Sequence, residues 1–186
     1  MTHFGDRLTE ANRRTATPLC MGIDPHISMI PAIFGNAQDG AASDAAIRAI
    51  DDFSMACLEQ AIGNVAAIKP QAAFFEQQGP AGMKILQNLG RAAIDAGLLV
   101  IMDAKRGDIG STSTAYAAGW IGHDAPFPSD ALTVNPWLGI DTLAPFLDRA
   151  DATGSGLFIL NRTSNPGAGD LQDQMVDGQP LYQHLA

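Results

Sequence analysis

Several charged residues in the middle of this sequence lie at the end of a predicted buried strand. A charge there is costly unless it is paired or takes part in chemistry. Asp103, Lys105 and Asp108 lie within the run Asp-Ala-Lys-Arg-Gly-Asp-Ile that ends at Ile109. Asp103 and Lys105 are two residues apart at the end of a predicted strand, so both side chains point to one face. Two carboxylates around an amine favour its charged form and make it a proton donor. We predict acid catalysis by Lys105; an exposed ion-pair cluster on a loop is the alternative.

Two further charged residues end other predicted strands. Lys69 follows a short apolar run, so it needs a partner, and Asp103 and Asp24 are the expected ones. The alternative for Lys69 is a side chain that snorkels to the surface. Asp24 precedes Pro25, and this pair also initiates turns.

Polar residues also follow the last two apolar runs. Asn135 ends the fourth run and Arg162 ends the fifth, and both are candidate substrate-binding residues. Ser164 lies in the glycine-containing loop 162–167, whose donors can hold a small polar ring or a phosphate. The same residue types also build turns, so this alternative stays open.

The sequence lacks the patterns of common metal and cofactor sites. No G-x-G-x-x-G follows a predicted strand, and no G-x-S-x-G is present. The cysteines have no neighbouring metal-type ligands, and the histidines have no ligand spacing; they are Cys20, Cys57, His3, His26, His123 and His184. We therefore predict no metal and no cofactor.

Alternating strands and helices must position these residues. Continuously apolar runs predict parallel strands buried on both faces, at 18–24, 65–70, 98–105, 131–136 and 156–162. Apolar periodicity and capping residues predict helices at 43–62, 82–96, 111–121 and 138–150, with another beginning near Pro180. This alternation predicts βα units and an α/β fold.

Five βα units suit either a doubly wound sheet or a (β/α)8 TIM barrel. Polar residues at the carboxyl end of every strand favour the barrel, because that is where a barrel builds its site. A barrel needs about 250 residues. We therefore expect residues 1–186 to form a single incomplete barrel domain, truncated at the C-terminus after about five units.

The composition limits the classes of molecule that this protein is expected to bind. The formal net charge of −9 argues against nucleic acid and anionic membranes as partners. No apolar run approaches the length of a membrane span, and the first ten residues do not form a secretory signal. Two cysteines and seven methionines favour a reducing, cytoplasmic location.

Together these motifs resemble the orotidine 5′-phosphate decarboxylase family, in its bacterial branch with longer loops. The run 103–109 matches the family's D-x-K-x-x-D-I signature. Further matching segments occur in the family's order, at 22–25, 69–76, 133–136 and 162–167. The resemblance implies a cofactor-independent carboxy-lyase that converts orotidine 5′-monophosphate to uridine 5′-monophosphate and CO2 in de novo pyrimidine biosynthesis.

The resemblance also implies roles for individual residues. Lys105 resembles the general acid that protonates C6 of the pyrimidine, and Asp103 the carboxylate set against the substrate's own carboxylate. Lys69 resembles the second lysine, which bridges that array and the ribose. Asp24 corresponds to a ribose-hydroxyl ligand and Ser164 to a pyrimidine contact.

A homodimer is likewise implied. Asp108 and Thr112 correspond to residues that reach across a two-fold axis into the partner's site. The family's phosphate-binding Arg and Gly-rich backbone, from its last two strands, are not among these 186 residues.

Two alternative functions are considered. A Mg²⁺-dependent sugar-phosphate lyase of the same superfamily shares the D-x-K-x-x-D motif and needs a further carboxylate for the metal, for which Glu76 is the candidate. The second alternative is an inactive truncated product or dimerisation fragment.

Overall fold

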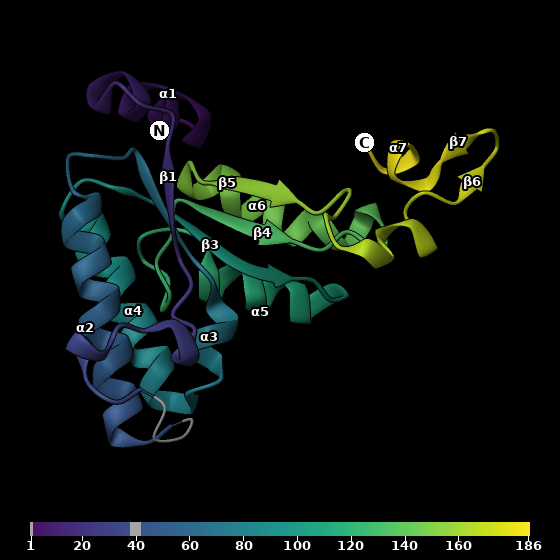
Figure 1. Ribbon diagram of the computed structural model, residues 1–186. Helices are drawn as coiled ribbons and strands as arrows, with labels where there is room; N and C mark the ends of the chain where they lie inside the picture. Colours follow the sequence, from purple (N-terminus) through teal and green to yellow (C-terminus); the bar gives the residue numbers. More distant parts are fainter. Residues whose placement is uncertain (1, 38–41) are drawn as a thin grey trace.

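The computed structural model describes residues 2–37 and 42–186 and shows a parallel sheet with helices packed on it (Figure 1). The strands of this sheet are β1 (Cys20–Ile23), β2 (Ala67–Pro70), β3 (Leu99–Arg106), β4 (Ala131–Val134) and β5 (Gly156–Ile159). The α-helices are α1 (Phe4–Thr15), α2 (Asp44–Ala61), α3 (Ala72–Glu76), α4 (Gly79–Asp95), α5 (Gly110–Trp120), α6 (Ala144–Thr153) and α7 (Leu181–Leu185). Shorter elements are the 3-10 helices η1 (Ile27–Met29), η2 (Ala32–Phe34), η3 (Ile140–Leu143) and η4 (Pro166–Asp170), and the two-stranded hairpin β6 (Met175–Val176) and β7 (Gln179–Pro180).

The order of the strands in space separates the two predicted architectures. The sheet runs β1-β2-β3-β4-β5, and each neighbouring pair is parallel. A doubly wound sheet reverses its strand order at a switch point, and its helices cover both faces. Here the order follows the sequence without reversal, as in a barrel wall.

Alternation along the strands gives the sheet two different faces. On one face, Ile68, Met102 and Leu132 join a large core with the crossover helices α2, α4, α5 and α6. On the other face, residues of opposite parity form a smaller cluster, which includes Leu99 and Ile101. Lys69, Asp103 and Lys105 share the parity of this second face, because successive strand side chains point to opposite sides. The charged residues are therefore on the face that the crossover helices leave uncovered.

Helix α1 covers the amino end of this second face and was not predicted from the sequence. Its Phe4 is buried against Gly156, where an added Cβ would lie 2.5 Å from the Phe4 ring, and meets the Phe158 ring edge-on at 5.9 Å. Leu8 and Ala11 pack in the same cluster. The spacing of these apolar positions at i, i+4 and i+7 is the signal that could have predicted the helix.

Most predicted elements agree with the structure to within a few residues. Ser43 caps α2, its hydroxyl accepting the backbone N–H of Ala46. The helix predicted at 138–150 is different: η3 comes first, and α6 runs from Ala144 to Thr153. Pro145 in the first turn explains the later start, because proline lacks the N–H that a preceding turn would need. No α-helix among the described residues is long and apolar enough to cross a membrane.

Candidate active site

The Asp103 carboxylate is the centre of a charged array at the carboxyl ends of β2 and β3. Its Oδ1 accepts hydrogen bonds from Lys105 Nζ at 2.5 Å and from Thr133 Oγ1 at 3.0 Å. Its Oδ2 accepts from Lys69 Nζ at 3.1 Å and from Gln71 Nε2 at 2.9 Å. Four donors surround one carboxylate, and two of them are ammonium groups, so the array carries one excess positive charge.

Burial and charge act in opposite directions on Asp103. Burial of the side chain, which is 11% exposed, disfavours its charged form. Hydrogen bonds from Lys105 and Lys69, together with their positive charges, outweigh that effect and lower the pKa of Asp103 below its ordinary value. Asp103 is therefore held as a carboxylate, and both lysines face it with side chains 37% and 46% exposed.

An irregularity in β3 brings Lys105 to this carboxylate. Met102 pairs with Leu132 and Arg106 with Val134, so the three residues between them on β3 face the single residue Thr133. Lys105 has a φ of 49°, a left-handed conformation that is uncommon for a residue with a side chain. Such bulges re-aim side chains and are frequent next to active sites.

Two predicted contacts of the array are wrong within this chain. Lys69 pairs with Asp103 as predicted, but Asp24 is exposed, and its carboxylate lies over Gly22, 3.0 Å from where a Cβ would stand. Asp108 does not bracket Lys105: its Oδ1 accepts the backbone N–H of Ile109 at 2.7 Å, and among the described residues it forms no ion pair. The amine is thus paired with one carboxylate of its own chain.

The other predicted residues lie around the array without joining it. Thr112 is exposed in the first turn of α5, and Ser164 is exposed in the loop after β5. Asn135 Oδ1 accepts the N–H of Trp137 at 2.9 Å. Arg162 forms a two-pronged ion pair with Asp173, both contacts at 2.8 Å, which lowers the pKa of that carboxyl.

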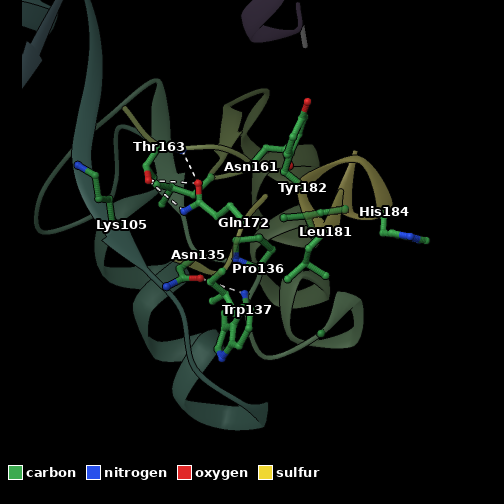
Figure 2. Close-up of a pocket in the computed structure, with 14 residues that line it drawn as sticks. Lys105, Asn135, Pro136, Trp137, Asn161, Thr163, Gln172, Leu181, Tyr182 and His184 are labelled. Atoms are coloured by element: carbon green, nitrogen blue, oxygen red, sulfur yellow. Dashed lines mark hydrogen bonds between the residues drawn. The ribbon is translucent and has the colours of Figure 1, made fainter. Parts of the chain in front are cut away.

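A cavity of about 570 Å³ lies beside Lys105, between the ends of β4 and β5 and the C-terminal segment (Figure 2). Its wall is largely apolar, with Trp137, Leu181 and Tyr182 among its residues. Asn135 lines it as well, whereas Ser164 and Arg162 do not. Figure 2 shows the hydrogen bonds between Thr163 and Gln172 that tie the two ends of the loop after β5 together.

The candidate metal ligand is engaged elsewhere. Glu76 Oε1 forms an ion pair with Arg106, whose guanidinium also lies 4.6 Å from the centroid of the Trp120 ring. No group of three His, Cys, Asp or Glu side chains in the described part of the chain is arranged to hold a metal ion. Within the described residues, Glu76 is therefore held by Arg106 and is not part of a group of candidate metal ligands.

Gln71 and Thr133 are members of the array that sequence reasoning missed. Both contact Asp103 directly, and Gln71 also forms an isolated parallel bridge with it. Their positions in the sequence carried a signal, since Gln71 is two residues after Lys69 and Thr133 is two before Asn135. Residues two apart on a strand share a face, but neutral side chains do not reveal that they bind a carboxylate.

A parallel sheet in sequential order, with ionised residues at the carboxyl ends of its strands, defines a protein of the β/α-barrel class. The family model of the Orotidine 5'-phosphate decarboxylase / HUMPS family matches residues 17–186. The chain belongs to this family, and its fold is an incomplete (β/α)8 barrel.

Named relatives agree with the family match. The chain is 44% identical to the orotidine 5'-phosphate decarboxylase of Rhodopirellula baltica, covering 100% of this chain and 63% of the relative. It is 44% identical to that of Streptomyces coelicolor, with 100% and 66% covered. A Streptomyces avermitilis structure assigned to the same activity superposes with a TM-score of 0.87 at 42% identity, covering 100% of this chain and 62% of that one. The chain thus spans somewhat less than two thirds of the length of these relatives.

Proposed function

We propose that the protein to which this chain belongs converts orotidine 5′-monophosphate to uridine 5′-monophosphate and CO2, in de novo pyrimidine biosynthesis. The observation that carries the proposal is the Lys69–Asp103–Lys105 array at the carboxyl ends of β2 and β3. Relatives that are 44% identical over the whole chain carry the name of this activity. We further propose that residues 1–186 are part of one barrel domain.

The array suits decarboxylation at an sp² carbon. When the bond between C6 and the substrate carboxylate breaks, the electron pair stays on C6, where the ring π-system cannot absorb it. Lys105 Nζ places a positive charge there and then donates its proton to C6 as CO2 leaves. Asp103 holds that amine and faces the substrate carboxylate. The proton comes from a side chain, so the proposed step uses no cofactor.

The remaining contacts follow the resemblance. Asp24 and Lys69 are proposed to bind the ribose hydroxyls, and Ser164 the pyrimidine. Asn135 is proposed to contact the substrate from the cavity wall that it lines. Arg162, which does not line this cavity and whose guanidinium is held by Asp173, is proposed as a further substrate contact. Groups for the phosphate are expected in the part of the relatives' length that this chain does not span.

The active form is proposed to be a cytoplasmic homodimer. Asp108 is free of intrachain ion pairs among the described residues, and Thr112 is exposed on α5. Both are therefore available to reach a partner's site across a two-fold axis. The net charge of −9 argues against nucleic acid and membranes as partners. The few cysteines support a cytoplasmic location.

The test is turnover of orotidine 5′-monophosphate by the full-length protein and two lysine variants. Lys105→Ala is expected to abolish turnover, while Lys84→Ala, on the exposed face of α4, keeps it. In D2O the product should carry deuterium at C6, which NMR detects. Unchanged turnover in Lys105→Ala would show that the array is idle, whereas no turnover by the wild-type protein would support the inactive alternative.

The intact mass of the native protein addresses the same alternative from another side. A mass about 10 kDa above the 19.5 kDa of this chain, equal to three more βα units of roughly 30 residues, supports a complete barrel. A native mass of 19.5 kDa favours the inactive product.

A further inference from the structure

Thr133 occupies a special place in the sheet, because it faces three residues of β3 by itself. The register pairs Met102 with Leu132 and Arg106 with Val134, which leaves only Thr133 opposite 103–105. In a regular parallel ladder, each residue of one strand faces one residue of the next strand, and the backbone N–H and C=O groups of the two strands form hydrogen bonds with each other. Here a side-chain hydroxyl takes over part of that pairing.

The Thr133 hydroxyl binds both reacting members of the array. It accepts the backbone N–H of Lys105 at 2.9 Å and donates to Asp103 Oδ1 at 3.0 Å. The same Oδ1 accepts Lys105 Nζ at 2.5 Å. One oxygen therefore fixes the backbone of the lysine relative to the carboxylate that its amine contacts. A hydroxyl can accept one hydrogen bond and donate another at the same time, so this single group serves both residues.

The backbone of Lys105 needs such a contact. Its φ of 49° lies in the left-handed region, which persists for a residue with a side chain only where the surroundings enforce it. Without the Thr133 oxygen, the Lys105 N–H loses the acceptor that holds this conformation. The direction in which the lysine side chain leaves the strand would then no longer be set.

We propose that Thr133 is a positioning residue for the proposed decarboxylation: its hydroxyl holds the Lys105 amine and the Asp103 carboxylate in the geometry that the reaction uses. Thr133 acts through these two residues and does not itself react. The inference rests on the proposed function, so its test includes one readout that does not depend on turnover.

The kinetic test uses Thr133→Val, which keeps the shape and removes the hydroxyl, and Thr133→Ser, which keeps the hydroxyl. In the full-length protein, Thr133→Val is expected to lower kcat by about 10- to 100-fold with KM nearly unchanged, because small misplacements of a reacting group cost rate. Thr133→Ser should restore most of kcat. The control is Thr15→Val, on α1, whose hydroxyl bonds Ala11 O at 3.0 Å far along the chain from the array.

The acid side of the pH profile adds a readout that loss of structure alone would not move. The Thr133 hydroxyl donates to the charged form of Asp103, so its removal is expected to raise the pKa of that carboxyl. The acid limb of kcat is expected to move to higher pH in Thr133→Val and to return in Thr133→Ser.

The turnover-independent readout is the reactivity of lysine amines, measured by reductive methylation and mass spectrometry. Lys84 is a reference in the same molecule, since it is exposed and its amine donates to Gln87 Oε1 at 2.8 Å. Labelling of Lys105 relative to Lys84 is expected to rise about twofold or more in Thr133→Val, since a weakened hydrogen bond frees the amine. If wild type shows no decarboxylation, the proposed function fails, and labelling alone decides the positioning role.

Three results would overturn the inference: kcat of Thr133→Val within about twofold of wild type, Thr133→Ser as slow as Thr133→Val, or unchanged labelling of Lys105. Thermal unfolding followed by circular dichroism checks that each variant folds. If Thr133→Val does not fold, Thr133→Ala, which loses the same hydroxyl in a smaller side chain, takes its place against Thr133→Ser.

Discussion

Two buried carboxylates, one at each end of the sheet, bind cations in similar ways, but their partners and surroundings differ. Asp103 at the carboxyl end contacts Lys69 and Lys105. Asp130, next to the amino end of β4, contacts Arg7 and His123 and accepts the backbone N–H of Val100 at 2.8 Å. Both carboxylates are shielded from water, with side chains 11% and 1% exposed.

The difference lies in the partners and in what surrounds them. At Asp130 the main cation is a guanidinium, and Arg7 also donates to Gly154 O at 3.0 Å, so one cluster joins α1 to the strands. At Asp103 the cations are amines on flexible stems, half-exposed, beside a strand whose backbone is held in an uncommon conformation. An ammonium group can donate a proton to a basic centre that forms beside it, whereas a guanidinium stays charged. We therefore propose that similar ion pairs stabilise the fold at one end and serve chemistry at the other.

The largest expected effect breaks the array. Asp103→Asn is expected to lower kcat by about 10³-fold, since it removes a preorganised charge from the site. The free energy of unfolding should change much less, because the freed lysines are half-exposed and can reach water. Turnover and urea unfolding of the full-length protein measure the two quantities. A variant that loses stability in proportion to activity would contradict the assignment of Asp103 to chemistry.

The second effect breaks the amino-end cluster. Asp130→Asn is expected to lower the free energy of unfolding by about 3 kcal/mol, since it leaves Arg7 and a buried backbone N–H without their charged partner. The kcat of the folded protein should stay near that of wild type. Urea unfolding followed by fluorescence, with turnover measured well below the unfolding midpoint, tests both statements. A drop in kcat without a drop in stability would show that Asp130 serves activity and not the stability of the fold.

The third effect is the pH dependence of the Asp103 contribution. The pKa of Asp103 is below its ordinary 3.8 in the folded chain, so its ionised form stabilises the fold above that pH. The stability difference between wild type and Asp103→Asn should therefore be full at neutral pH. It should shrink as the pH falls below 3.8 and through the lowered folded pKa. Urea unfolding of both proteins at descending pH measures it, and a difference that grows toward acid would be the wrong sign.

The smallest effect concerns the exposed member of the amino-end cluster. His123 contacts Asp130 Oδ1 at 2.8 Å, but its side chain is 53% exposed. His123→Ala is expected to lower the free energy of unfolding by less than about 1 kcal/mol, as for other exposed pairs. Thermal melts of His123→Ala and Asp130→Asn, run side by side, compare the two members. An equal loss of stability in both variants would show that the His123 contact accounts for most of the stability that the cluster contributes.

Local patterns in the sequence were enough to predict the elements and the charged pair. Short apolar runs predicted the five strands, because each run ends where polar residues begin. Burial on both faces was correct for most of β2, β3 and β4 but wrong for β1 and β5, most of whose residues are partly or fully exposed. The cap at Ser43 and the spacing of Asp103 and Lys105 were also readable, since both depend on neighbours a few residues apart. The resemblance to the family rested on the same local motifs, and the family match confirmed it.

Contacts between distant segments were decided only by the tertiary structure. The sequential strand order, the cover of α1 and the pairing of Arg162 with Asp173 follow from packing and not from any local pattern. Two expected contacts, of Asp24 with Lys69 and of Asp108 with Lys105, do not form, because sharing an edge of the sheet does not set where a side chain ends. The array depends on a register shift against β4 that brings Thr133 to both Asp103 and Lys105. A shift between strands about 30 residues apart leaves no trace in either strand alone, so the sequence determined the chemical groups, and the fold determined their geometry.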